Sequence, residues 1–183
     1  MGLKREKIVL GVLIVAVIAG FLVVHFKRTP FSPPKRSTTG TLQKAGPLWA
    51  YPDPARTPGF ANPDITQANI EETICNPGCS TRSIRPSSSY TTRVKKQQLR
   101  EWGLPGTAAD YEEDHFISLE LGGDPTDPRN LWPEPYSPRP GAKEKDVVEN
   151  YLHKQVCSGT MTLQEAQRDI TTDWYKIYLR VHQ

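Results

Sequence analysis

The stretch from Tyr111 to Pro133 constrains the fold more than any other part of this 183-residue chain. It reads YEEDHFISLELGGDPTDPRNLWP, and apolar residues alternate two apart from Ile117 to Leu121. Gly122-Gly123 interrupts the run, and a second apolar piece follows near its end. Alternation, a glycine break and a second extended piece are typical of a β-hairpin. We therefore expect a strand through the apolar run, a turn and a second strand.

Acidic residues run directly into a histidine at the start of this predicted hairpin. Asp114 precedes His115, and an imidazole beside a carboxylate is suited to holding a proton or a metal ion. We expect the His115 ring to project from the hairpin into a pocket floored by the next predicted helix, residues 142–156. A hydrogen-bonded core histidine next to a paired aspartate is the alternative.

The pair Asp114-His115, the Gly122-Gly123 turn, Asn130-Leu131 and the helix after them resemble the HNH (ββα-metal) nuclease family over roughly residues 114–152. The resemblance implies that His115 is the general base, that Asp114 binds a divalent metal, and that Asn130 fixes the loop aiming the histidine. It also implies a nucleic acid partner and Mg²⁺, Mn²⁺, Ni²⁺ or Zn²⁺ as cofactor. Phosphodiester hydrolysis needs both a base near neutral pKa and a cation on the developing charge.

The remaining metal ligand departs from the family pattern, in which the helix usually supplies a further His or Asn. Here that helix offers Asp146 and Glu149 in its first turns and His153 later. We take Asp146 and Glu149 as the candidate ligands. Ion pairs with Lys143 or Lys145 of the same helix are the alternative reading.

A second likeness covers residues 57–174, which resemble a group of bacterial envelope proteins sharing the patterns TIC, IRP, EEDH, NLWP and VCSG. This likeness implies no activity. The function predicted is therefore a metal-dependent HNH-like nuclease, and the alternative is a non-catalytic envelope protein that keeps the fold for binding or scaffolding.

The beginning of the chain predicts a membrane anchor. Residues 8–24 read IVLGVLIVAVIAGFLVV without a charge, and at ~1.5 Å per residue this helix spans about 26 Å of a roughly 30 Å hydrocarbon core. We predict a short tail at residues 1–7 and a transmembrane helix at residues 8–26. A cleaved signal peptide is the alternative, but its apolar region is usually shorter and ends in a small-x-small site. The very short tail and the cysteines favour an extracytoplasmic location for the bulk of the chain.

Proline is frequent from residue 27 to residue 61, where it removes backbone donors and biases the preceding residues to extended forms. We predict a Pro-rich linker there and a globular α+β domain at residues 62–183, with a small β-hairpin and flanking helices. Residues 90–102 predict a basic helix, read either as a phosphate-binding surface or as a solvated face, since the net charge of +3 alone gives no strong signal. Thr162-x-x-Glu165 is a capping box that opens the last helix.

The three cysteines leave two possibilities open. Cys75 and Cys79, together with His153 and Cys157 one helical turn apart, could form a zinc site. The favoured prediction is a Cys75–Cys157 disulfide outside the cytoplasm, with Cys79 free.

Overall fold

The computed structural model describes residues 44–78 and 81–182, and within these ranges the protein is a mixed α+β domain. The strands are β1 (Tyr111–His115) and β2 (Leu131–Pro135), and the helices are α1 (Ser88–Trp102), α2 (Ala142–Cys157) and α3 (Leu163–Val181). Short 3-10 turns lie ahead of α1, between α1 and β1, and between the two strands. The α+β prediction is confirmed at this level.

The predicted tail at residues 1–7, the predicted membrane span at residues 8–26 and the first part of the predicted linker lie outside the described residues. Within residues 44–78 and 81–182, every helix is too short or too polar to be a candidate for crossing a bilayer.

The two strands pair antiparallel, with His115 opposite Leu131 and Tyr111 opposite Pro135. The strand therefore precedes the alternating apolar run, and the prediction of a strand through that run is wrong. Residues 116–121 instead form a bend and the 3-10 turn η5 (Leu119–Leu121), and their apolar side chains are all buried. A strand would turn alternate residues to opposite faces. A tight turn can direct all of them inward, and here it ends at Gly122, which has a left-handed φ of 71°.

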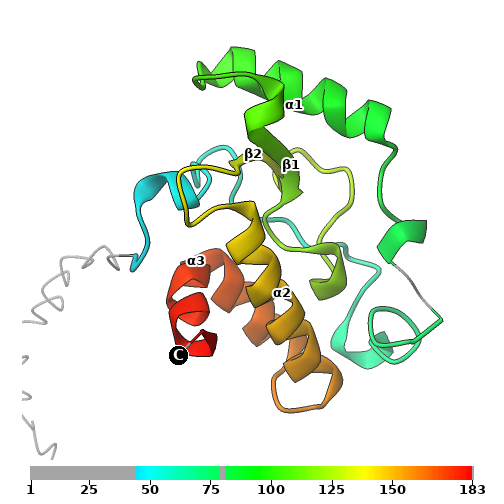
Figure 1. Cartoon of the computed structure of the whole chain (residues 1–183). Helices are drawn as coiled ribbons and strands as arrows, with labels where there is room; N and C mark the ends of the chain where they lie inside the picture. Colours follow the sequence, from blue (N-terminus) through cyan, green and yellow to red (C-terminus); the bar gives the residue numbers. More distant parts are fainter. Residues whose placement is uncertain (1–43, 79–80, 183) are drawn as a thin grey trace, which may run out of the picture. The chain divides into compact units, whose positions relative to one another are not determined.

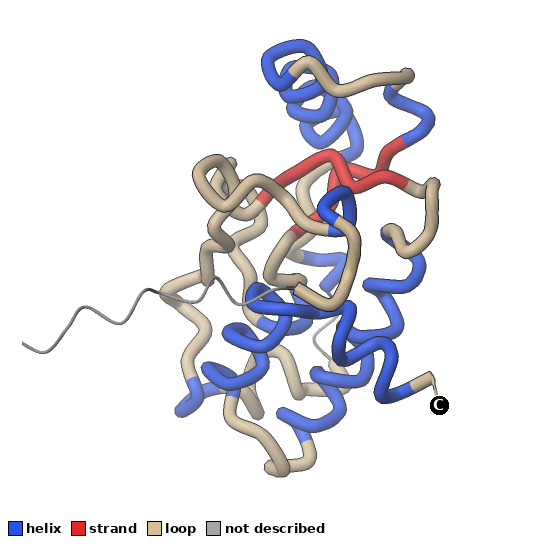
Figure 2. Tube along the Cα trace, turned by 90° about the vertical axis from the view of Figure 1, so that its left-hand side faces the viewer, coloured by secondary structure: helices blue, strands red, loops and turns tan. Residues whose placement is uncertain are grey.

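The hairpin lies between α1 on one side and the packed pair of α2 and α3 on the other, as both views show (Figures 1 and 2). From α1, Lys95 Nζ donates to the carbonyl oxygen of Tyr111 at 2.7 Å, and Gln98 Nε2 donates to that of Leu131 at 3.0 Å. From α2, Lys145 Nζ donates to the carbonyl oxygen of His115 at 2.9 Å. Both ends of the hairpin backbone are thus held by side chains of the flanking helices.

The main core is formed where α2 packs against α3. An apolar stripe of α2 is buried, and α3 contributes a second buried stripe at steps of three and four. These residues are Val148, Leu152, Val156, Ala166, Ile170, Trp174 and Ile177. The predicted capping box opens α3, because the Thr162 hydroxyl accepts from Glu165 N and Thr162 N donates to Glu165 Oε2. This core positions α2 and hence its polar N-terminal half beneath the hairpin.

The globular part begins earlier than the predicted residue 62. Ala50 and Thr57 are fully buried, and Trp174 Nε1 donates to the carbonyl oxygen of Ala50 at 2.7 Å. Residues 48–56 also frame a hollow of about 450 Å³ together with Trp102 and Trp132. Residues 44–61 are therefore a packed strap on the domain, because Ala50, Tyr51 and Thr57 give this proline-rich segment enough to bury.

Candidate functional site

Neighbouring residues of β1 face opposite sides of the hairpin, because side chains alternate along a strand. Asp114 is paired with Trp132, and it faces α2; His115 is paired with Leu131. The two residues that the sequence joins as one motif therefore enter different surroundings.

Lys145 of α2 occupies the centre of a buried acidic cage. Its Nζ lies 2.5 Å from Asp114 Oδ2 and 3.8 Å from Glu134 Oε2, and it also contacts Glu149 Oε1 one turn further along α2. The Lys145 side chain is 0 % exposed. Together with the His115 carbonyl oxygen, these contacts give the ammonium group polar partners contributed by both strands and by its own helix.

Burial and charge act in opposite directions on the pKa values of the cage residues. Burial opposes charge on Lys145, but the carboxylates of Asp114, Glu149 and Glu134 hold its pKa well above the usual value. Burial likewise opposes charge on Asp114, but Lys145 brings the Asp114 pKa down to about 2. Burial raises the pKa of Glu149 to about 8 and that of Glu134 well above its usual value. The attraction of Lys145 thus lowers the pKa of Asp114 below its usual value, whereas for Glu149 and Glu134 burial outweighs that attraction.

Two of the three predicted metal ligands meet in this cage, and a lysine stands between them. Asp114 and Glu149 both contact Lys145, whereas Asp146 is exposed and interacts with Asp114 and Lys145 only through its charge. Among the described residues, the only His, Cys, Asp and Glu side chains grouped closely enough to hold a metal ion are Cys75, His153 and Cys157. The predicted alternative, an ion pair within α2, is what the structure contains.

The His115 ring is sealed in the interior, with 2 % of the residue exposed. The expectation that it projects into an open pocket is therefore wrong. Its Nε2 lies 3.0 Å from the carbonyl oxygen of Pro125, and because a carbonyl only accepts, Nε2 carries the proton. Burial lowers the pKa of His115, so the ring is neutral and its Nδ1 keeps a free electron pair.

Asn130 holds the loop that covers this ring. It is fully buried, and its Oδ1 accepts from Ile117 N at 2.9 Å and from Phe60 N at 3.3 Å. Its Nδ2 donates to the carbonyl oxygens of Ile117 and Asp124, both at 3.0 Å. Asp124 immediately precedes Pro125, the acceptor of His115.

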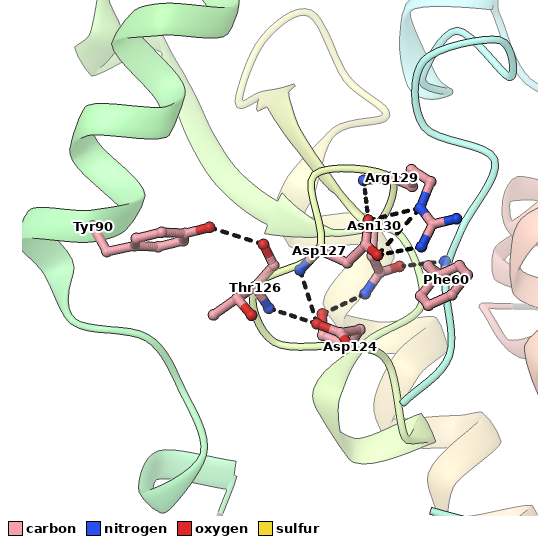
Figure 3. Close-up of polar contacts among 7 residues, drawn as sticks. All are labelled: Phe60, Tyr90, Asp124, Thr126, Asp127, Arg129 and Asn130. Atoms are coloured by element: carbon pink, nitrogen blue, oxygen red, sulfur yellow. Dashed lines mark hydrogen bonds and ion pairs between the residues drawn. The ribbon is translucent and has the colours of Figure 1, made fainter. Parts of the chain in front are cut away.

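The rest of the covering loop is fastened on both sides (Figure 3). Asp124 Oδ1 accepts from Thr126 N and Asp127 N, each at 2.8 Å, and the Tyr90 hydroxyl of α1 donates to the carbonyl oxygen of Thr126. Arg129 pairs with Asp127 and lies 3.6 Å above the centre of the Phe60 ring. These contacts tie the loop to α1 and to the N-terminal strap, so opening the loop over His115 would break several of them together.

Glu113 is a second buried acid on β1, on the same face as His115. Among the described residues its carboxyl oxygens have no hydrogen-bond partner. Burial raises the pKa of Glu113 to about 8, against the attraction of Lys95. Glu113 is therefore mainly protonated at neutral pH.

Three residues of this region were not singled out as functional from the sequence. Lys145 had a visible signal, since Glu149 lies four residues after it on one helix face. Glu134 had none, because only the strand register brings it to the cage. Arg85 is exposed and lies ahead of α1 in the sequence. Its positive charge lowers the pKa values of both His115 and Asp146, as a smaller contribution beside the effect of burial.

The last residue of α2 is joined to the segment before α1. Cys75 and Cys157 form a disulfide with Cα atoms 5.3 Å apart, as the favoured pairing predicts. His153, one turn before Cys157, has its Nε2 2.8 Å from the carbonyl oxygen of Ile74 and its Nδ1 3.7 Å from Glu120 Oε2. Cys79 lies outside the described residues.

Comparisons of this chain with protein-family models, with curated proteins and with solved structures find no match.

Proposed function

We propose that this protein is a membrane-tethered, extracytoplasmic binding or scaffold module that keeps a ββα arrangement without acting as a metal-dependent nuclease. The observation that carries the proposal is the ammonium group of Lys145, buried between Asp114 and Glu149. These carboxyl groups were the predicted metal ligands, and the protein supplies its own cation to them.

A divalent ion would be strongly disfavoured beside this lysine. Two unit charges 4 Å apart interact by about 4 kcal/mol at an effective dielectric constant of about 20, so a divalent ion near Lys145 would meet roughly twice that repulsion. Binding would require the ammonium group to leave the cage or lose its proton. The pKa of Lys145, held well above its usual value by the three acids, makes loss of the proton unfavourable.

The surroundings of His115 also support a structural role. A general base must come within hydrogen-bond reach of the water or hydroxyl it deprotonates. The His115 ring is buried under residues 124–129, and that loop is tied to α1, Phe60 and Asn130. The imidazole then acts as a buried hydrogen-bonding group that joins β1 to the loop.

The tether and location belong to the same proposal. The uncharged apolar run at residues 8–24 supports a single membrane anchor, and residues 27–43 would separate it from the domain. The Cys75–Cys157 disulfide supports an oxidising compartment, because disulfides persist mainly outside the cytoplasm.

A cleavage assay tests the proposal. The full-length protein in mild detergent is incubated with plasmid DNA and with RNA, each with Mg²⁺, Mn²⁺, Ni²⁺ or Zn²⁺, beside a His115→Ala variant purified identically. We expect equal, background-level cleavage from both proteins. Metal-dependent cleavage by the wild type that His115→Ala abolishes, with the variant still folded by circular dichroism, would overturn the non-catalytic assignment.

The second candidate is the HNH-like nuclease, which one observation specifically favours. The Pro125 carbonyl fixes the proton of the neutral His115 ring on Nε2, and Asn130 fixes the residue next to Pro125. The remaining nitrogen, Nδ1, has the free electron pair that a general base requires. In this candidate, Asp114 and Glu149, with Asp146, would hold the metal once Lys145 moved aside. The same assay decides between the two functions, and Asn130→Ala should then lose cleavage together with His115→Ala.

A further inference from the structure

We propose that the reduced form of this protein binds one Zn²⁺ ion through Cys75, Cys157, His153 and Glu120, so that zinc and the disulfide are alternative links between the same two segments. The proposal is independent of whether the domain is catalytic. It concerns the far end of α2, where the sequence alone suggested a zinc site that also included Cys79.

Three of the four ligands already converge. One ligand atom each of Cys75, His153 and Cys157 lies within 4.8 Å of the others, and all three residues are partly exposed. His153 and Cys157 are four residues apart on α2, so they share one helix face. Partial exposure gives an ion a path to the group, and a sulfur–imidazole donor set suits zinc.

His153 is oriented as a metal-binding histidine would be. Its Nε2 lies 2.8 Å from the carbonyl oxygen of Ile74, which can only accept, so that nitrogen carries the proton. The free electron pair is then on Nδ1. Histidines that bind metals generally donate their other N–H to a carbonyl or a carboxylate in this way, because the bond fixes the tautomer and the ring plane.

Glu120 supplies the fourth donor. Its Oε2 lies 3.7 Å from His153 Nδ1. Two ligand atoms bound to one tetrahedral zinc at about 2.0–2.1 Å lie roughly 3.3 Å apart, so Glu120 Oε2 needs only a small approach to His153 Nδ1. The Glu120 carboxylate lies outside the group of ligand atoms that are within 4.8 Å of one another, so it must move further toward the sulfurs. The present distance is too long for a direct hydrogen bond, and an ion between the two atoms would satisfy both.

Reduction breaks the sulfur–sulfur bond between the two cysteines, and zinc binding then forms two zinc–sulfur bonds. A dithiol or phosphine reductant delivers two electrons and two protons to the Cys75–Cys157 disulfide, which becomes two thiols while the reductant is oxidised. Binding of Zn²⁺ then releases both thiol protons and forms two zinc–sulfur bonds of about 2.3 Å. The two sulfurs must move to about 3.8 Å apart around a tetrahedral ion, while their Cα atoms are 5.3 Å apart in the disulfide form. The disulfide form offers no thiolate, so it excludes the ion.

The test uses the full-length protein in mild detergent under anaerobic conditions, in an oxidised sample and in one reduced and then desalted. Co²⁺ serves as a spectroscopic probe, because thiolate ligands give a near-ultraviolet charge-transfer band, and Zn²⁺ should displace it. We expect one equivalent of metal with that band in the reduced chain and neither in the oxidised chain. Equal zinc in both forms, no zinc in the reduced form, or a reduced chain that is unfolded by circular dichroism would each overturn the proposal.

Variants that keep the disulfide test the ligand set. His153→Gln and Glu120→Gln can be shown to fold while oxidised, and after reduction each should bind Co²⁺ at least tenfold more weakly. Cys79→Ser is the matched control, and it should bind as tightly as the wild type. Loss of binding in Cys79→Ser, or unchanged binding in His153→Gln, would show that the four ligands named here are the wrong set.

Discussion

Replacing Lys145 by methionine should strongly destabilise the domain. Methionine keeps much of the length and apolar stem of lysine but removes the ammonium group. Asp114, Glu149 and the His115 carbonyl oxygen then lose their shared donor. Because Lys145 is fully buried, water does not simply replace that donor.

The size of the effect follows from Asp114. Its pKa of about 2, against an ordinary value of 3.8, corresponds to about 2 kcal/mol of favourable interaction that depends chiefly on Lys145. Without the lysine, Asp114 must either stay charged in the interior or take up a proton at neutral pH, which adds to the cost. Removing one partner of a buried ion pair generally costs about 3–5 kcal/mol, and we expect a loss in that range at pH 7.5.

The loss of unfolding free energy caused by Lys145→Met should be smaller at lower pH. In the wild type, the contribution of Asp114 is fully present above pH 3.8 and disappears only between pH 3.8 and 2. In Lys145→Met, Asp114 is raised above its ordinary pKa, so the folded variant takes up a proton more readily than the unfolded one and gains stability as the pH falls. The difference in unfolding free energy between the proteins should therefore narrow by about 1 kcal/mol or more from pH 7.5 to pH 5.

Urea unfolding at pH 7.5 and pH 5 measures both quantities. Lys143→Met is the matched control, since Lys143 is exposed on the same helix, and it should change the stability by no more than about 0.5 kcal/mol. A Lys145→Met loss below 1 kcal/mol at pH 7.5, or a loss of the same size at both pH values, would refute the account of the cage.

Further outcomes follow from the same structure. Millimolar Mn²⁺ should raise the melting temperature of Lys145→Met but not that of the wild type, because only the variant leaves Asp114 and Glu149 without a cation; an equal effect on both would contradict this. The wild type should lose stability as the pH rises from 5 to 8, by on the order of 1 kcal/mol per pH unit for each of Glu113 and Glu149. The reason is that folding raises the pKa of each from 4.5 to about 8, so the folded protein holds their protons more tightly than the unfolded chain. A urea midpoint that rises over this pH range would argue against the raised pKa values. Asn130→Ala should cost about 3 kcal/mol in urea unfolding, because it leaves buried backbone groups of Ile117 and Asp124 unpaired, whereas Asn150→Ala on the exposed side of α2 should cost little. Reducing the disulfide, which joins residues 82 positions apart, should lower the unfolding free energy by up to about 4 kcal/mol without added metal, and Cys79→Ser should leave the oxidised protein unchanged in a thermal melt.

Local patterns were sufficient for the helices of this protein. The capping box at Thr162 and the predicted helices at residues 90–102 and 142–156 each depend on residues close together in the sequence. Such contacts are the same in most tertiary surroundings, so their sequence signals are dependable. The favoured Cys75–Cys157 pairing is present in the structure, and its signal was the predicted location outside the cytoplasm.

The positions of the hairpin strands were harder to predict, because a segment forms a strand only where another segment is available to pair with it. The apolar run at residues 116–121 alternates as a strand would, but it lies against α2 and α3, where a 3-10 turn buries every one of its apolar side chains. The polar segment Tyr111–His115 became the strand instead, supported by β2 and by donors from α1 and α2.

The sequence by itself determined the α+β class, the approximate bounds of α2 and α3, and the presence of Glu149 near Asp114. Only the tertiary structure decided that the cation beside these carboxyl groups is the ammonium group of Lys145. The strand register places Glu134 opposite Glu112, and α2 directs Lys145 toward Asp114 and Glu134 of the hairpin. The loop that Asn130 holds covers His115. Ion pairs between distant segments are set by long-range packing, and a run of residue letters does not contain the distances that decide whether a carboxylate meets a metal or a lysine.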